Sequence, residues 1–394
     1  MKNWIIAGGL LFALCSNAQQ KGMIQEEIVG HIYKPKKERP DRKFMESLKL
    51  PEGFEIDKFA ENLGKPRMMA KDSRGNIYVT RRVGDIIRLT DSDNNGTADG
   101  RDTVLKKEGI HGIDIVGDTM YLVTVNEVFK TTIDQKGTLG SLEQLIDDLP
   151  DGGQHANRTL KMGPDGMLYV SIGSTCNACD ETGEESATML KVNPKTGDHS
   201  IFAKGLRNTI GFDWQPGTDI LYGMDHGIDW LGDDEQQEEL NKLTEGNDYG
   251  WPYIYADGKF NQADEPKNMG WEEYAKKTTE PVLLFTAHSA PLDMIFYRGK
   301  MFPEAYRNKA LVTFRGSWNR RPPSGYKLIS IGFEDGSSIA SEDFVSGFLS
   351  DDGKSQYGRL VGLLELGDGS VLMSDDENGI VYRISYQGTG TGKK

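Results

Sequence analysis

The chain has 394 residues, of which 47 are glycine, 15 proline and 3 cysteine, and 37% belong to the hydrophobic set. That apolar share is enough for a folded core and argues against wholesale disorder, while abundant glycine without matching proline indicates many tight turns. A formal charge of −14 argues against a nucleic-acid-binding protein, because neutralising phosphates needs a basic surface. A neutral small substrate or a basic protein partner fits this charge.

The first eighteen residues predict a secretory signal peptide. Lys2 is followed by an apolar run over 4–14 and then by small residues ending at Ala18, after which we place the cleavage. The alternative is a lipoprotein acylated at Cys15, which Leu14 disfavours because the lipoprotein signal needs a small residue there. No later stretch approaches the ~20 apolar residues of a membrane span. We therefore expect a periplasmic or secreted protein.

Two further terminal segments flank the expected domain. Residues 19–48 are charged and irregular, and they predict a mobile arm that leads into the domain. Residues 387–394 are rich in glycine and predict a flexible tail. The folded domain is therefore expected over 49–386.

Within that domain, a polar turn followed by a short β-rich run occurs six times. The copies align on Val79, Leu122, Val170, Tyr222, Val312 and Leu372, with steps of 43, 48, 52, 90 and 60 residues. Units that recur every ~40–50 residues predict an all-β fold, a six-bladed β-propeller. Tandem β-sandwiches would have no reason to repeat the same turn six times. The longest step leaves room for an insertion over 251–279, with a helix at 271–277.

Cys176 and Cys179 are the two cysteines of the exported chain. In an oxidising compartment this spacing predicts a disulfide that closes a small loop. A thioredoxin-like redox pair would need a βαβ pattern around it, and a zinc site would need two further ligands, neither of which the sequence offers.

The polar loops beside the repeated strands are the candidate functional segments. Propellers carry their function in loops over the central channel. These loops occupy 151–158, 173–179, 205–211, 225–234, 287–291, 316–320 and 357–359. Arginines and histidines that converge there from an acidic chain would suit a bound polyanion.

Several of these segments together carry a resemblance to a known family. They read LPEGFEI, HANRTLKMGPDGMLYVSIGSTCNAC, GLRNTIGFDWQPGTDILYGMDHGIDWLGDD, ELNKLTEGNDYGWP, HSAPL, GSWNR and GRLVGLLELGDGSVLMSDD. The chain resembles the soluble glucose/sorbosone dehydrogenases that depend on pyrroloquinoline quinone (PQQ), and CNAC and GSWNR are most similar to the sorbosone branch. The resemblance implies a six-bladed propeller that oxidises an aldose or related sugar aldehyde at C1, with hydride transfer to the quinone.

The resemblance also implies roles for single residues. His155 matches the catalytic histidine that takes the proton of the C1 hydroxyl, and an imidazole suits a general base at neutral pH. Arg207 and Asn208 match the pair that lies against the quinone carbonyls and stabilises oxyanion character there. Arg359 matches an arginine that pairs with a PQQ carboxylate, and Arg320 is expected to do the same where the glucose enzymes have a lysine. The further cofactor-binding candidates are Arg158, Asn177 and His288.

A cofactor calcium ion is implied by the same resemblance. The family holds it largely with backbone carbonyls in the loop after the fourth repeat, here Gly227, Ile228 and Asp229, although the glucose enzymes have Gly-Pro at the first two positions. Hard oxygen ligands suit Ca²⁺, which would polarise the quinone. The carboxylates over 233–239 are equally explained as a solvated acidic face.

A second, structural calcium site is suggested by the residues alone. The segment 91–102 has oxygen donors at the EF-hand spacing, namely Asp91, Asp93, Asn95, Asp99 and Asp102. The alternative is a hairpin turn, because turns use the same residue types for backbone reasons.

The leading hypothesis is thus a periplasmic PQQ- and Ca²⁺-dependent sugar dehydrogenase that passes electrons to a periplasmic acceptor such as a cytochrome c. A calcium-dependent lactonase-type hydrolase is one alternative, and it would need a cage of inward carboxylates. A non-catalytic propeller that binds carbohydrate or protein is the other, because fold alone does not guarantee chemistry. It would gain support if His155 and the arginines did not converge.

Overall fold

Strands form nearly all the regular structure of the computed structural model, which describes residues 28–334 and 337–388. The helical elements among these residues are short: α1 (Arg42–Ser47), α2 (Trp271–Ala275) and a 3₁₀ turn, Glu304–Tyr306. In this part of the chain no helix is long and apolar enough to cross a bilayer. The predicted signal peptide and its cleavage position lie outside the described residues.

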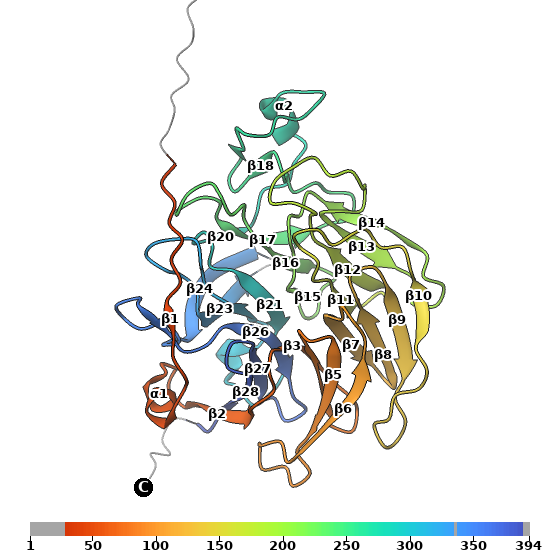
Figure 1. Cartoon of the computed structure of the whole chain (residues 1–394), viewed down its shortest axis with the longest axis vertical. Helices are drawn as coiled ribbons and strands as arrows, with labels where there is room; N and C mark the ends of the chain where they lie inside the picture. The colour runs from red at the N-terminus through yellow and green to blue at the C-terminus, as the bar shows by residue number, and fades with distance from the viewer. Residues whose placement is uncertain (1–27, 335–336, 389–394) are drawn as a thin grey trace, which may run out of the picture.

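Six antiparallel four-stranded sheets surround a central axis, which confirms the predicted six-bladed propeller (Figure 1). From the channel outward, five blades consist of β3 (Pro66–Lys71), β4 (Ile77–Arg81), β5 (Asp85–Thr90) and β6 (Gly100–Lys106); β7 (Gly112–Val116), β8 (Thr119–Val123), β9 (Val128–Thr132) and β10 (Glu143–Ile146); β11 (Thr159–Met162), β12 (Leu168–Ile172), β13 (Thr188–Val192) and β14 (His199–Lys204); β15 (Phe212–Trp214), β16 (Leu221–Asp225), β17 (Glu238–Leu243) and β20 (Leu283–Phe285); and β21 (Pro291–Phe296), β22 (Ala310–Phe314), β23 (Lys327–Glu334) and β24 (Ser337–Val345).

Both ends of the domain build the sixth blade, which closes the ring. Its strands are β26 (Leu360–Glu365), β27 (Val371–Asp375), β28 (Ile380–Tyr386) and, outermost, β2 (Phe54–Ala60). β2 pairs antiparallel with β28, so that Phe54 lies opposite Tyr386. Backbone hydrogen bonds therefore join the N-terminal strand to the C-terminal hairpin.

The sequence repeat marks the second strand of each blade. All six aligned positions, from Val79 in β4 to Leu372 in β27, fall in that strand. The turn before it requires a left-handed backbone, with φ of +75° at Gly166 and +88° at Gly369. In the fifth blade Asn308 takes this place at φ +64°, since asparagine tolerates that conformation better than most side chains. The turns thus explain part of the glycine excess.

The core lies between the faces of neighbouring blades rather than in one central layer. One apolar cluster joins β3–β5 to β7–β9, and another joins β16 and β17 to the fifth blade. Buried aspartates on inner strands add polar links between blades. Asp213 accepts a hydrogen bond from the Phe296 amide at 2.7 Å, and Asp293 accepts one from the Leu363 amide at 2.7 Å.

The N-terminal segment contacts the propeller, contrary to the expectation of a mobile arm. From residue 28 it runs along one side of the blades (Figure 1), and β1 (Lys36–Lys37) pairs parallel with β25 (Ser355–Gln356). Phe44 of α1 is buried, stacks on Tyr357 at 4.5 Å between ring centroids and meets Phe348 edge-on. The apolar face of α1 was hidden among charged residues in the sequence.

The predicted insertion lies within the fourth blade, between β17 and β20. It contains the two-stranded sheet of β18 (Ile254–Tyr255) and β19 (Lys259–Phe260), followed by α2 inside the range predicted for a helix. This segment projects from the ring at the edge of the blade (Figure 1).

Candidate active site

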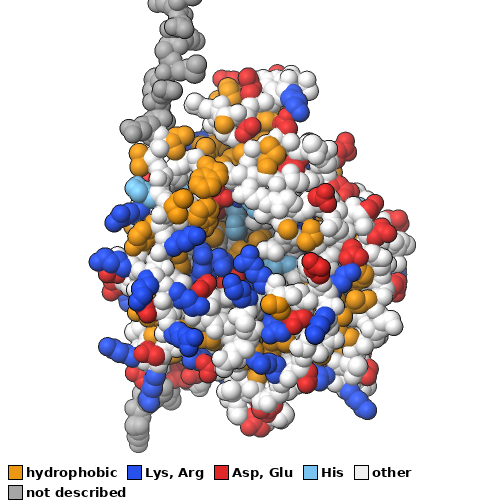
Figure 2. Space-filling model, in the orientation of Figure 1, with side chains coloured by type: hydrophobic (Ala, Val, Ile, Leu, Met, Phe, Trp, Pro, Cys, Tyr) orange, Lys and Arg blue, Asp and Glu red, His pale blue; other side chains and the backbone are white. Residues whose placement is uncertain are grey.

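A polar cavity of about 330 Å³ opens where inner strands begin and second strands end. Figure 2 shows a hollow in the middle of this face with histidine side chains in it and many Lys and Arg side chains around it. The polar lining includes Arg67, Arg82, His155, Arg207, Asn208, His226, Asp229, Glu238, His288, Arg315, Asn319 and Arg359. Five arginines against two carboxylates make the cavity a site for an anionic ligand.

His155 precedes β11, and its hydrogen bonds define its tautomer. Its Nδ1 lies 3.0 Å from the Ser174 carbonyl oxygen and 2.8 Å from Ser174 Oγ. That hydroxyl donates its own proton to the Cys176 carbonyl at 2.7 Å, so Nδ1 carries the proton and Nε2 keeps its lone pair. Burial, and next the positive charge of Arg207, lower the pKa of His155 to about 3. The imidazole is therefore neutral and able to accept a proton at pH 7.

Arg207 and Asn208 precede β15, where a buried carboxylate fixes their backbone. Asp225 at the end of β16 accepts hydrogen bonds from both amides at 2.9 Å, and burial raises its pKa to about 6. The Arg207 guanidinium donates to Asn177 and to Asp229 Oδ2 at 3.0 Å. The side-chain amide of Asn208 forms no hydrogen bond with any other described residue and lines the cavity, so it is available to a ligand.

His288 also lines the cavity, where its ring bridges two loops. Its Nε2 donates to the Gly232 carbonyl at 2.7 Å, and its Nδ1 accepts from Asn319 Nδ2 at 3.1 Å. Asn319 donates in addition to Asp229 Oδ1 at 3.1 Å. Both ring nitrogens of His288 are therefore occupied within the protein, and burial lowers its pKa.

A cluster of three arginines forms another part of the lining. Arg67 and Arg315 share the Asp376 carboxylate, at 2.8 and 3.0 Å, and Arg359 donates to the carbonyls of Arg315 and Gly316. Burial and the neighbouring Arg315 lower the pKa of Arg359 to about 10. Since one carboxylate serves this group, the cluster keeps an excess of positive charge for an anion.

Arg158, Arg320 and Asn177 lie outside the cavity lining, contrary to their predicted contact with a cofactor. Arg158 is fully buried, and its guanidinium donates to the carbonyl oxygens of Val125, Pro150, Asp151, His155 and Gly173. Arg320 donates to two loop carbonyls and to Asp234 at 3.1 Å. Their donors are used to hold loops because crowded loop carbonyls leave few other partners.

The predicted cofactor-calcium loop combines free carbonyls with engaged side chains. The carbonyl oxygens of Gly227 and Ile228 accept no hydrogen bond from the described residues, whereas the Asp229 carboxylate is bound by Arg207 and Asn319. The neighbouring carboxylates are not all a solvated face. Glu238 is buried, accepts the Gly227 amide at 2.9 Å, and has its pKa raised to about 8 by burial.

The segment 91–102 has the geometry of the alternative, a hairpin turn, between β5 and β6. Asp91 accepts hydrogen bonds from backbone amides, Gly96 N at 2.8 Å among them, and Asp99 accepts from Ser92 N at 3.0 Å. Asp102 pairs with an arginine of β5 at 3.0 Å. Among the described residues, no three of the segment's carboxylates converge as metal ligands. The structural calcium stays a prediction.

The predicted disulfide between Cys176 and Cys179 is present. Sequence reasoning missed Arg67, Arg82, His226, Glu238 and Arg315, which also line the cavity. A signal for two of them existed, since Arg67 lies in the inner strand of its blade and Arg315 directly follows a second strand, where the predicted residues also lie.

The fold and the cavity define a six-bladed propeller with an arginine-rich site at its channel mouth. The family model TrAA12-like matches residues 48–387, and the chain belongs to this family. An uncharacterized protein of Borreliella burgdorferi is 33% identical over 360 residues, covering 86% of this chain and 91% of its own length. The PQQ-dependent pyranose dehydrogenase of Coprinopsis cinerea is 23% identical over 86% of this chain and 54% of its own length.

Solved structures below 25% identity share the fold. The calcium structure of Trichoderma reesei family AA12 has a TM-score of 0.76 at 22% identity, covering 86% of this chain and 97% of the other. The holo PQQ domain of the Coprinopsis cinerea pyranose dehydrogenase has 0.73 at 20%, covering 90% and 100%. The PQQ-bound aldose sugar dehydrogenase of Streptomyces coelicolor has 0.61 at 18%, covering 86% and 99%. These relatives bear out the resemblance to PQQ-dependent sugar dehydrogenases.

Proposed function

We propose that this protein is a PQQ-dependent dehydrogenase that oxidises an aldose or related sugar at C1. The observation that carries the proposal is the convergence of His155, Arg207, Asn208 and Arg359 on one cavity, with the Nε2 lone pair of His155 free. The family and its PQQ-dependent relatives support the same assignment.

The residues of the cavity fit PQQ, an anionic o-quinone with three carboxylates. Arg67, Arg315 and Arg359 would hold carboxylates, and Arg207 with the unpaired Asn208 amide would face oxygen that gains negative charge. PQQ supplies a two-electron hydride acceptor when it is bound. Calcium would bind to oxygen ligands such as the free carbonyls of the 227–228 loop.

His155 performs the proton chemistry in this proposal. Its Nε2 accepts the proton of the sugar C1 hydroxyl while the C1 hydrogen leaves with its two electrons as hydride. The hydrogen bonds from Nδ1 to Ser174 hold the ring and stabilise the imidazolium that forms. Burial favours the neutral ring before the reaction, so the base is ready at neutral and mildly acidic pH.

The two alternative functions have less support from the site. A lactonase-type hydrolase needs a cage of carboxylates, but in the described part of the chain no three metal-ligating side chains gather at the cavity, and Asp229 is engaged by Arg207. A non-catalytic propeller would not require a neutral histidine to meet a ring of arginines in one cavity.

Reconstitution tests the proposal directly. The purified protein is titrated with PQQ in Ca²⁺ buffer by absorbance and then assayed by dye reduction across aldoses, with lactone hydrolysis as the comparison. We expect saturable PQQ binding and sugar-dependent reduction. Failure to bind PQQ, or lactone hydrolysis without dye reduction, would refute the proposal.

We also propose export to the periplasm and electron transfer to a periplasmic acceptor such as a cytochrome c. The signal-like sequence before Ala18 supports export. Mass analysis of the protein recovered from cell fractions tests it, because cleavage after Ala18 gives an N-terminus at Gln19, whereas acylation at Cys15 would indicate the lipoprotein. Reduction of an added cytochrome c during sugar turnover tests the acceptor.

A further inference from the structure

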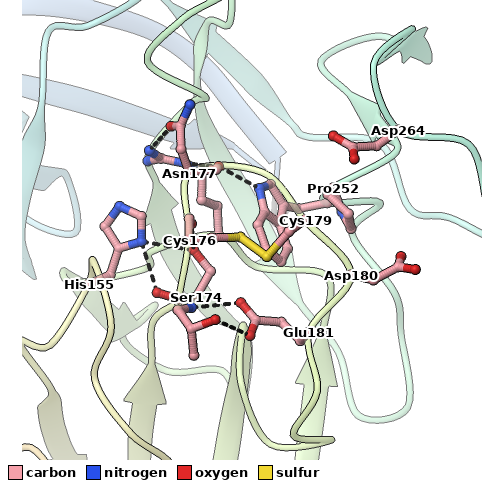
Figure 3. Close-up of a disulfide and its surroundings, with 12 residues drawn as sticks. His155, Ser174, Cys176, Asn177, Cys179, Asp180, Glu181, Pro252 and Asp264 are labelled. Atoms are coloured by element: carbon pink, nitrogen blue, oxygen red, sulfur yellow. Dashed lines mark hydrogen bonds between the residues drawn. A yellow bond between two sulfur atoms is a disulfide. The ribbon is translucent and has the colours of Figure 1, made fainter.

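One short loop contacts both His155 and Arg207. Residues 173–179 follow β12, and Figure 3 shows the loop between the two side chains. Ser174 accepts the Nδ1 proton of His155, and Asn177 accepts hydrogen bonds from the guanidinium of Arg207. The proposed base and the proposed oxyanion donor are thus oriented by one segment.

Asn177 uses both of its oxygens on Arg207. Its carbonyl oxygen accepts from Arg207 Nε at 2.9 Å, and its side-chain Oδ1 accepts from Nη2 at 2.6 Å. Oδ1 also accepts the Asp229 amide at 2.9 Å, while the carbonyl accepts Trp251 Nε1 at 3.3 Å. Two acceptors on one residue fix the plane of the guanidinium as a single acceptor would not.

The loop that carries Asn177 is itself held at several points. The Cys176–Cys179 disulfide closes a ring around it (Figure 3). Both the amide and the hydroxyl of Thr175 donate to Glu181 at 2.6 Å. Movement of Asn177 therefore requires the ring to deform, and this restricts the rotamers open to Arg207.

We propose that Asn177, held by the Cys176–Cys179 disulfide, is a positioning residue that fixes the Arg207 guanidinium at the cavity and thereby sets the protonation of His155. Its importance for turnover rests on the proposed dehydrogenase function. The positioning itself is a property of the chain without any cofactor, so it can be measured independently.

The consequence for His155 follows from the charges around it. The charged and titratable groups that act on it are Arg207, His226 and Arg158, and all three lower its pKa, Arg207 the most after burial. Loss of the Asn177 side chain frees the guanidinium to move toward solvent. The pKa of His155 should then rise, by about one pH unit, because a like charge has left its surroundings.

A double-mutant cycle tests this coupling. Asn177→Ala, Arg207→Met and the double variant are compared with the wild type, and Asn95→Ala in the exposed β5–β6 hairpin is the matched control. The His155 resonance is followed by NMR against pH in the protein without PQQ. We expect both single variants to raise the pKa of His155, the double variant to equal Arg207→Met, and the control to change nothing.

The same variants give a kinetic measurement. Asn177→Ala should lower kcat about tenfold with less than about a twofold change in the sugar KM, because Arg207 acts in the reaction step rather than in sugar binding. Additive shifts in the cycle, or an unchanged His155 titration in Asn177→Ala, would overturn the proposal. If the wild type fails to oxidise sugars, the dehydrogenase function fails, and the titration still decides the positioning.

The disulfide is tested by the Cys176→Ser/Cys179→Ser variant and by reduction of the wild type with a phosphine. We expect the variant and the reduced protein to show the same higher pKa of His155, with the thermal transition retained. The variant should not respond to the phosphine. A His155 titration that is identical with and without the disulfide would remove it from the proposal.

Discussion

Replacing Arg158 by methionine separates a loop-holding role from a cofactor-binding role. The guanidinium donates to five carbonyls, of which His155 at 2.8 Å and Pro150 at 3.0 Å are the closest. Each hydrogen bond to a charged group contributes roughly 1.5–3 kcal/mol, so the two short bonds contribute about 5 kcal/mol. Burial lowers the pKa of Arg158 from 12.5 to about 10, which corresponds to about 3 kcal/mol of desolvation that methionine would not incur.

The expected net loss for Arg158→Met is therefore about 2–4 kcal/mol once the three longer contacts are included. The thermal transition should fall by about 5 °C, and kcat should fall because the carbonyl of His155 loses its anchor. Calorimetry, a PQQ titration and dye reduction are run beside Arg82→Met, an exposed arginine of the cavity lining. If Arg158→Met kept its thermal transition but lost PQQ binding, the predicted cofactor contact would be right and our interpretation wrong.

Three other predictions concern the base, the N-terminal segment and the β5–β6 hairpin. His155→Ala should reduce kcat/KM by about 10²–10⁴ with PQQ affinity retained. Since a base works above its pKa, and that of His155 is about 3, wild-type kcat/KM should stay level from pH 8 to 5; an acid limb near 6.5 would contradict the burial effect. Phe44→Ala should cost about 3 kcal/mol in urea unfolding, whereas an unchanged midpoint would mean that α1 is not anchored. Asp93→Ala should leave Ca²⁺ binding by calorimetry unchanged, and loss of a bound ion would restore the structural calcium site.

The sequence predicted the fold well because the propeller repeats a local signal. Each second strand begins with a turn whose backbone requires glycine or asparagine, as at Gly166 and Asn308, and a repeated local requirement is visible without tertiary information. The closure by β2 and β28 was not visible, because it joins segments more than 300 residues apart. The anchoring of Phe44 depends on the same kind of distant contact.

The site was predicted by residue type more reliably than by direction. Arg158 and Arg207 both lie in polar loops before an inner strand, yet one donates to backbone carbonyls while the other reaches the cavity. The difference lies in the available partners, since Arg158 is surrounded by carbonyl oxygens and Arg207 by the side chains of Asn177 and Asp229. Sequence patterns give no distances between loops, so they cannot distinguish these cases.

The placement of Arg207 has two effects that depend on one geometry. A guanidinium at the cavity attracts an anionic ligand and stabilises developing negative charge, and the same charge keeps the His155 imidazole neutral. Binding of an anion would offset part of that charge and bring the pKa of His155 back toward its usual range. The base would thus become a better proton acceptor once the anionic ligand is present, because a higher pKa strengthens its affinity for a proton. An imidazole that is neutral but weakly basic in the empty cavity would then gain basicity where it is needed.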